Sequence, residues 1–419
     1  LNAYLLTLII IAQQSSDTTG EKEKENLMKK KIVSALLCVA MIATMVTGCG
    51  GSKSSSTSGN ADSTAKQFEI NAAIAANPPA LDPHTVNANV TGAIGIHIYE
   101  ALFQMDENYE PQPVLAESYE MSDDGKEYTI KLRQGVKFHN GDEMKADDVV
   151  ASMNRWMELS PKAKTLIGGS VFEKVDDYTV KLTVNEPSSD IIMVLASPIQ
   201  FAAIYPKSVV DSASDEGVKE YIGTGPYKVA EWKQDQYVKL EKNEDYQPAK
   251  GKSSGLAGAK NAQADTITFN IVTDTATRIA GVQNGQYDIA EDIPADQYKD
   301  LAADKNLTMD VRSGGTLNLF LNTTEGVMAD EKVRQAALAA LNCDDILMAS
   351  YGDADLYKLN AGWCNPDDAQ WGTEAGSEYY NQNDVEKAKK LLKKASGTEK
   401  DCARSFSYAA IQYKFIEYQ

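Results

Sequence analysis

Residues 92–157 read GAIGIHIYEALFQMDENYEPQPVLAESYEMSDDGKEYTIKLRQGVKFHNGDEMKADDVVASMNRWM, and their order of apolar patterns and turns decides the fold. An apolar run from Ala93 to Phe103 has helical spacing and is followed by two prolines, Pro111 and Pro113. The triplet 123–125, Asp-Asp-Gly, is a turn signal between two alternating segments and predicts a pair of antiparallel strands. Nothing in this stretch is arranged for catalysis.

The second half of the stretch predicts a strand with one dry face, then a turn and an amphipathic helix. The apolar residues of the strand alternate with Thr129 and Lys131, and they are Tyr128, Ile130 and Leu132. The segment 139–142, His-Asn-Gly-Asp, predicts the turn. Acidic residues suited to a helix start precede apolar residues at helical spacing, which are Val149, Val150, Met153, Trp156 and Met157.

This order of motifs resembles the extracellular solute-binding proteins of family 5, the oligopeptide-, dipeptide- and nickel-type receptors of ABC importers. The matching residues, in order, are Ala101-Leu102-Phe103, Pro113 to Glu120, Asp124 to His139 and Ala146 to Arg155. The resemblance implies an α/β fold with the two lobes of a periplasmic-binding protein, a hinge between them, and an extra α+β lobe inserted in lobe I. It also implies a binding protein rather than an enzyme.

The resemblance divides the chain into segments. It places lobe I at 66–97 and 187–313, the extra lobe at 98–186, and the start of lobe II at 314–397. After Gly397 the resemblance fades, and residues 398–419 are interpreted as an aberrant tail. A frameshift or truncation there would leave lobe II incomplete, and we then expect that the chain binds no ligand tightly.

The N-terminal region predicts export and a lipid anchor. Residues 28–48 have the charged start and apolar centre of a signal peptide, and Val46-Thr47-Gly48-Cys49 resembles a bacterial lipobox. We therefore expect cleavage before Cys49 and lipidation of its thiol; an ordinary signal peptide with an incidental cysteine is the alternative. Residues 49–65 are rich in Gly, Ser and Thr, which predicts a flexible linker.

Residues 1–27 precede this signal peptide and are interpreted as an over-extended gene start, with translation beginning at Met28. The alternative is a second membrane anchor, although the apolar run Leu1 to Ala12 is shorter than the ~20 residues of a spanning helix. Of the cysteines after Cys49, the pair Cys343 and Cys364 could form a disulfide, and free thiols are an equal alternative.

Charge and length narrow the class of protein further. From Cys49 onward, 36 basic residues face 56 acidic ones, a formal net charge of −20. Such a surface repels nucleic acid and anionic membranes, so a nucleic-acid partner is not expected. Those 371 residues suffice for two or three domains at ~150 residues each.

Two later segments predict lobe structure. In 267–290 a strand, a helix capped by Asp274 and ended by Gly285, and a second strand form a β-helix-β unit, which predicts a parallel α/β core. Residues 316–321 predict a strand, and helices are expected from Asp330 and from Asp384.

Candidate ligand-binding residues lie in three segments. The resemblance implies that the loop from Thr85 to Thr91 faces the ligand; a solvated turn is the alternative. Aromatic residues in a polar loop can form a ligand wall, or they can be core residues. The candidates are Asn87, Asn89, Val90, Asn318, Asn322, Trp363 and Trp371.

Motifs for other chemistry are missing from the sequence. The three histidines lack metal-ligand spacing, and no GxSxG elbow or GxxxxGK[ST] loop is present, so no catalytic residue, metal or cofactor is expected. The acidic pairs sit at turns and at a helix start, where backbone N–H groups explain them; a secreted glycosidase is the enzyme alternative.

The sequence thus predicts a lipoprotein outside the bacterial cell membrane that captures peptides and delivers them to an ABC permease, while separate ATPase subunits supply energy. Alternatives are a receptor for a nickel chelate, glutathione or an oligosaccharide, a non-transport binding lipoprotein, and a non-functional truncated product.

Overall fold

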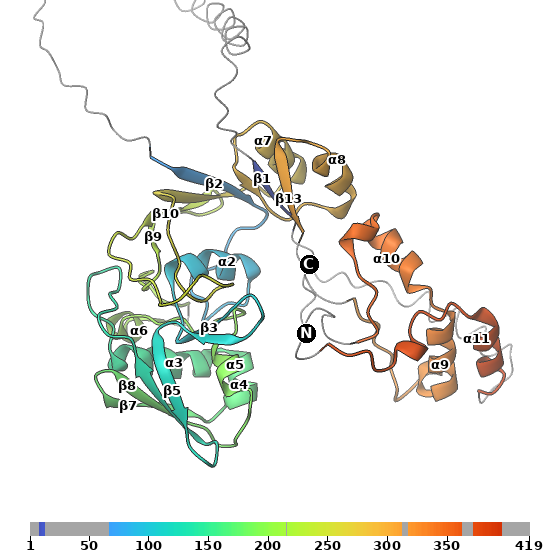
Figure 1. Ribbon diagram of the computed structural model, residues 1–419, viewed down its shortest axis with the longest axis horizontal. Coiled ribbons are helices and arrows are strands. Elements are labelled where there is room, and N and C mark those ends of the chain that lie inside the picture. The colour runs from blue at the N-terminus through green and yellow to red at the C-terminus, as the bar shows by residue number, and fades with distance from the viewer. Residues whose placement is uncertain (1–7, 13–66, 215, 312–316, 363–371, 396–419) are drawn as a thin grey trace, which may run out of the picture. The chain divides into compact units, whose positions relative to one another are not determined.

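The computed structural model describes residues 8–12, 67–214, 216–311, 317–362 and 372–395 (Figure 1). All of these except Gln67 belong to one compact unit. Within the described ranges, no helix has the length and apolar character needed to cross a membrane.

A seven-stranded mixed sheet has the strand order β13-β1-β12-β2-β11-β10-β9. Strand β2 is parallel to β11 and β12, and the remaining neighbours are antiparallel. This confirms the predicted parallel α/β core. The strands are β1 (Leu8–Ala12), β2 (Glu69–Ile74), β9 (Tyr227–Lys233), β10 (Tyr237–Lys242), β11 (Thr266–Ile271), β12 (Ile289–Ala290) and β13 (Leu307–Val311).

Helix α7 (Thr275–Gln283) connects β11 to β12 and begins and ends as its sequence predicts. The Asp274 carboxylate accepts a hydrogen bond from the Thr277 backbone N–H at 2.8 Å, which caps the helix. Gly285 follows with φ +75°, a conformation that costs glycine little. The buried Arg278 donates to the carbonyls of Val272, Thr273, Glu291 and Asp292, so it ties this helix to the ends of two strands.

A four-stranded antiparallel sheet has the order β5-β6-β8-β7 and carries its own core. Its strands are β5 (Ala116–Met121), β6 (Glu127–Leu132), β7 (Val171–Asp176) and β8 (Thr179–Thr183). Tyr128, Ile130 and Leu132 are buried as predicted, and they share the core with Trp156 of helix α3 (Ala146–Leu159). Helices α4 (Pro161–Ile167) and α5 (Ile191–Leu195) also contribute to this core, and α6 (Lys207–Asp211) follows.

The predicted helix from Ala93 to Phe103 is wrong at both ends. Helix α2 spans Asn89–Ile98, and Phe103 begins strand β3 (Phe103–Met105), which pairs with β4 (Pro111–Pro113). Residues 99–103 are all buried, so a mostly apolar run, interrupted only by Glu100, hides the change from helix to strand.

The predicted strand at 316–321 is also wrong where it can be checked. Residues 317–322 form no strand, and Leu317, Leu319 and Phe320 are each 60% exposed. Alternation alone does not make a strand, because a strand also needs a hydrogen-bonding neighbour.

The predicted helices of the last segment are confirmed. Asp330 and Asp384 cap α9 (Glu331–Ala340) and α11 (Val385–Leu392) through the backbone N–H groups of Lys332 and Lys387. The other helices are α8 (Tyr298–Ala302), α10 (Cys343–Tyr351) and the 3-10 turns Ala295–Gln297, Val327–Ala329, Ala354–Leu356 and Ser377–Tyr379.

Candidate ligand-binding site

A pocket of about 200 Å³ lies beside the start of α2. Most of its wall is apolar, and three amide side chains supply the polar part. The lining residues are Pro83, Val86, Asn87, Ala88, Asn89, Gly92, Ala93, Ile96, Pro198, Ile199, Gln200 and Leu256. An apolar cavity with a few polar groups is the usual composition of a small-molecule site.

Two chain segments form most of this pocket. The first begins at Pro83, in the loop that follows β2, and runs into α2, and the second is the loop 198–200 after α5. The hydroxyl of Thr91 donates to the Ala80 carbonyl at 2.6 Å, which fixes the start of α2 against the preceding loop. Gly92 lies beside the second segment, and a Cβ built on it would be 4.0 Å from the Pro198 carbonyl oxygen, which is ordinary van der Waals contact.

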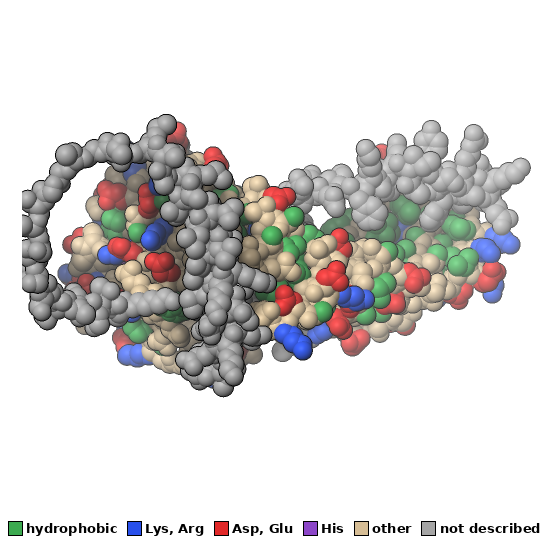
Figure 2. All heavy atoms as spheres, turned by 90° about the horizontal axis from the view of Figure 1, so that it is seen from above, with side chains coloured by type: hydrophobic (Ala, Val, Ile, Leu, Met, Phe, Trp, Pro, Cys, Tyr) green, Lys and Arg blue, Asp and Glu red, His purple; other side chains and the backbone are tan. Residues whose placement is uncertain are grey.

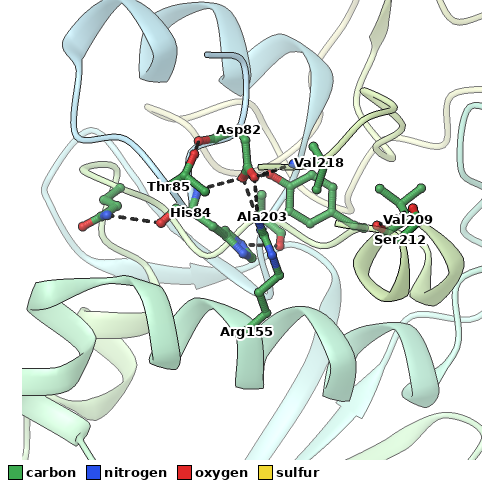
Figure 3. Close-up of polar contacts among 10 residues, drawn as sticks. Asp82, His84, Thr85, Arg155, Ala203, Val209, Ser212 and Val218 are labelled. Atoms are coloured by element: carbon green, nitrogen blue, oxygen red, sulfur yellow. Dashed lines mark hydrogen bonds and ion pairs between the residues drawn. The ribbon is translucent and has the colours of Figure 1, made fainter. Parts of the chain in front are cut away.

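The first segment is anchored by the buried carboxylate of Asp82 (Figure 3). Arg155 of α3 donates to it from Nη2 at 2.7 Å and from Nη1 at 3.4 Å, and the Tyr205 hydroxyl donates at 2.8 Å. The backbone N–H groups of His84 and Val218 donate at 3.0 and 3.1 Å. Every lone pair of this buried charge therefore has a donor, as a buried charge requires.

The same contacts explain the ionisation of Asp82. Burial raises the pKa of its carboxyl, but the hydrogen bond and the charge of Arg155, with the Tyr205 hydroxyl, more than offset this and leave the pKa below the usual value. Asp82 thus remains an anion, and Arg155 remains paired with it.

His84 is held as a neutral ring. Burial lowers the pKa of His84 to about 3, and its Nε2 lies 2.9 Å from the Ala203 carbonyl oxygen, so Nε2 carries the proton. Its Nδ1 has no hydrogen-bond partner among the described residues. The ring packs edge-on against Tyr205, with 5.0 Å between the centroids. These contacts give His84 a structural role.

The second segment is anchored through Gln200. Its backbone φ of +49° is in the left-handed region, which is uncommon for a residue with a Cβ. The Trp156 ring N–H donates to its carbonyl oxygen at 2.7 Å, and the Ser160 hydroxyl donates to its side-chain oxygen at 3.1 Å. Its side-chain NH₂ donates to the His84 carbonyl at 3.3 Å, which joins the two pocket segments.

The structure brings together only part of the predicted site. Asn87 and Asn89 both line the pocket and are exposed. Asn89 and Val90 belong to the first turn of α2 rather than to a loop, which corrects the predicted loop from Thr85 to Thr91. Val90 packs against the core of the seven-stranded sheet.

The remaining candidates lie elsewhere. Asn318 and Asn322 do not line this pocket, and the Asn322 side-chain oxygen accepts from the backbone N–H of Thr324 at 2.9 Å, as in a local turn. Cys49, Trp363, Trp371 and Cys364 lie outside the described residues. Cys343 is half-buried and has a free thiol within the described part of the chain.

Sequence reasoning missed Gln200, Asp82 and Arg155 as parts of the site. Asp82 stands in the segment Leu81-Asp82-Pro83-His84, which signals only a loop. No local sequence pattern marks Gln200 as a site residue, because its partner His84 is 116 positions away in the sequence. Within the described residues, no group of three His, Cys, Asp or Glu side chains is placed to hold a metal ion.

Comparison with known proteins places the chain in a family. The sequence profile of the bacterial extracellular solute-binding proteins, family 5 Middle, matches residues 110–410. The glutathione-binding protein GsiB of Salmonella typhimurium is 33% identical over 338 residues, which cover 78% of this chain and 61% of that protein. A probable peptide ABC transporter periplasmic-binding protein, y4tO of Sinorhizobium fredii, is 29% identical over 326 residues and 76% of this chain.

A similar solved structure is also a periplasmic binding protein. The periplasmic binding protein DppA from Helicobacter pylori, in complex with the peptide STSA, has a TM-score of 0.58 and 26% identity. That alignment covers 78% of this chain and 66% of DppA. The chain spans 61% of the length of the GsiB proteins it matches. The predicted fold class is confirmed, and the chain belongs to the bacterial extracellular solute-binding proteins of family 5.

Proposed function

We propose that this chain is the substrate-binding component of an ABC import system and that it captures peptides outside the membrane for delivery to the permease. The observation that carries this proposal is the match of residues 110–410 to family 5. Two relatives support peptide as the ligand class, namely a probable peptide transporter protein and DppA in complex with STSA. The chain acts by binding and release, without chemical change of its cargo.

The apolar wall and the exposed amide groups of the pocket support a peptide as the ligand. Its apolar wall, with Val86, Ile96 and Ile199, suits an apolar side chain, and burial of such a side chain contributes about 1.5–3 kcal/mol. The exposed amides of Asn87 and Asn89 can donate to and accept from a peptide main chain, since each carries both kinds of group. At about 200 Å³ the pocket is smaller than the ~300–1,000 Å³ of drug-sized sites, so it takes one side chain of a longer ligand.

Glutathione is the second candidate ligand. It is favoured by the 33% identity to proteins named glutathione-binding. Glutathione is itself a short peptide, so both candidates share main-chain amide groups, and they differ in charge and in side-chain size.

The proposal includes a lipid anchor and a division into lobes. Cleavage before Cys49 with acylation of its thiol would tether the protein through the linker 49–65. Lobe I at 66–97 and 187–313 would carry the pocket, the extra lobe at 98–186 would pack on it, and lobe II would begin at 314. Mass spectrometry of the membrane-bound protein should find an acylated N-terminal Cys49, and a Cys49→Ser variant should leave the membrane fraction.

Titration calorimetry of the full chain tests the ligand class. We expect weak but saturable heat with tri-leucine or with glutathione, and none with maltotriose or a nickel–histidine complex. Saturable heat with maltotriose alone would overturn the assignment to peptides. Hydrolysis of any bound peptide, followed by mass spectrometry, would overturn the assignment to a binding protein.

A further inference from the structure

Helix α3 contacts both segments that form the pocket, although it belongs to the core of the four-stranded sheet and lines no part of the pocket itself. Three residues near its C-terminal end make these contacts, and they are Arg155, Trp156 and the capping residue Ser160. Figure 3 shows the Arg155 side chain rising from the helix toward Asp82 and the loop of Thr85.

Arg155 controls the first pocket segment through Asp82. The Asp82 side chain is 1% exposed and that of Arg155 is 10% exposed, so solvent screens this ion pair little. Asp82 immediately precedes Pro83, the first pocket residue, and also accepts from the His84 backbone N–H. Any displacement of the Asp82 carboxylate therefore moves the segment that presents Val86 and Asn87.

Trp156 and Ser160 control the second segment through Gln200. The left-handed backbone of Gln200 is unfavourable for a residue with a side chain, and such conformations persist only where surrounding contacts enforce them. The contacts on its carbonyl and its side-chain oxygen both come from the end of α3. Without these contacts, we expect the backbone of Gln200 to relax to negative φ, which would reorient the side chain of the neighbouring Ile199.

We propose that helix α3 sets the shape of the ligand pocket from outside, with Arg155 and Trp156 as positioning residues that hold the two pocket segments at a fixed separation. Under this proposal, the helix that packs on the four-stranded sheet influences ligand binding without contacting the ligand. The inference rests on the proposed function in one respect, namely that the pocket is where a ligand binds.

Ordinary structural support is the competing explanation, and the chain offers a matched control for it. Arg133 also uses its guanidinium to hold backbone carbonyls, those of Val114 at 2.8 Å and of Gln247 at 2.8 Å. None of these residues lines the pocket. Arg133→Lys and Arg155→Lys thus remove the same fork-shaped donor and keep the same charge, and only Arg155 is bonded to the residue next to the pocket-lining Pro83.

Hydrogen exchange of the full chain, followed by mass spectrometry, tests the proposal without any ligand. In Arg155→Lys we expect amides of residues 84–93 to exchange about tenfold faster than in the wild type, while those of β11 stay unchanged. In Trp156→Phe, which replaces the indole with a smaller phenyl ring and so removes the N–H donor to Gln200, the faster segment should be 198–203. In Arg133→Lys neither segment should change.

The proposal is overturned if 84–93 exchanges at the wild-type rate in Arg155→Lys, or if β11 accelerates equally, since that would mean general loosening. Calorimetry with tri-leucine then separates this result from the proposed function. If the wild type binds tri-leucine, Arg155→Lys should weaken binding about tenfold and Arg133→Lys should not. If the wild type binds no peptide but the exchange pattern appears, the positioning role stands and the peptide function fails.

Discussion

At the residue scale, the carboxylate of Asp82 shows how a buried charge is accommodated. Four donors from three distant parts of the chain and one from the nearby His84 backbone converge on it, and Arg155 supplies the compensating charge. A buried ion pair of this kind is a weak source of stability, but loss of one partner leaves the other charge unpaired in a dry site. The position of the pocket segment that begins at Pro83 therefore depends on the contacts of the Asp82 carboxylate.

Replacement of Asp82 by Asn should destabilise the fold strongly. The amide keeps the shape of the side chain but leaves Arg155 without a counter-charge and turns two acceptors into one, so we expect a loss of about 3–5 kcal/mol in the free energy of unfolding. Urea denaturation measures this. Asp147→Asn in helix α3, which removes an exposed partner of Lys174, should leave the midpoint near that of the wild type. Equal losses in both variants would contradict the account.

Stability should rise between pH 4 and pH 6.5 because of the histidines. Burial lowers the pKa of His84 to about 3 and those of His97 and His139 to about 4, whereas the unfolded rings titrate near 6.5. In this window the unfolded state binds more protons, so the folded state loses stability as the pH falls. Burial raises the pKa of Asp148 and Glu291, which opposes this effect.

The net uptake on unfolding near pH 5 should thus lie between about one and three protons. Urea midpoints at pH 7, 6 and 5 measure it, and His97→Gln should lower the slope by about one proton. A flat profile from pH 7 to pH 5 would contradict the lowered pKa values of the three rings.

At the element scale, local chemistry accounts for the helices that the sequence predicts well. Asp274, Asp330 and Asp384 each accept a backbone N–H at the expected helix start, and these caps depend only on neighbouring residues. The two errors have a different origin. The end of α2 lies inside a continuous buried run, and the strand at 316–321 depends on a neighbour that local pattern cannot supply. Gln200 escaped prediction for the same reason.

The motif Gly223-Thr224-Gly225 is an element-scale feature that the structure explains by packing. A Cβ on Gly225 would lie 2.5 Å from the His97 carbonyl oxygen, and one on Gly223 would clash with the Ile98 carbonyl, so both glycines allow this loop to touch the end of α2. The Gly225 N–H also donates to the Ile98 carbonyl at 2.9 Å. A phosphate site is not needed to account for the motif.

Gly225→Ala should therefore cost about 1–3 kcal/mol in the free energy of unfolding, because the added methyl group meets backbone that cannot move aside. Gly92→Ala is the matched change within α2, where a Cβ meets nothing closer than 4.0 Å. We expect it to be neutral, or to stabilise by up to ~1 kcal/mol through helix propensity. The midpoints of thermal unfolding of both variants test this prediction. If Gly92→Ala lowered the midpoint more than Gly225→Ala, the close approach at Gly225 would not be the reason for its glycine.

At the scale of the whole molecule, family membership and surface charge agree with an exported binding protein. Figure 2 shows acidic side chains scattered with basic ones over the described surface in view, in keeping with a formal net charge of −19. The sequence predicted family 5 from one ordered set of motifs, and the family profile confirms the family. It could not predict the pocket wall, because Gln200 meets His84, and Arg155 meets Asp82, only through folding.

Methyl NMR of the full chain, labelled at isoleucine, tests most directly whether this pocket receives a peptide side chain. On titration with tri-leucine we predict that the Ile96 and Ile199 methyl signals shift in a saturable way, while that of Ile130 in the core of the four-stranded sheet does not. Tri-lysine serves as the control for attraction to an acidic surface. Saturable peptide binding that leaves Ile96 and Ile199 unmoved, or shifts larger with tri-lysine than with tri-leucine, would contradict the account.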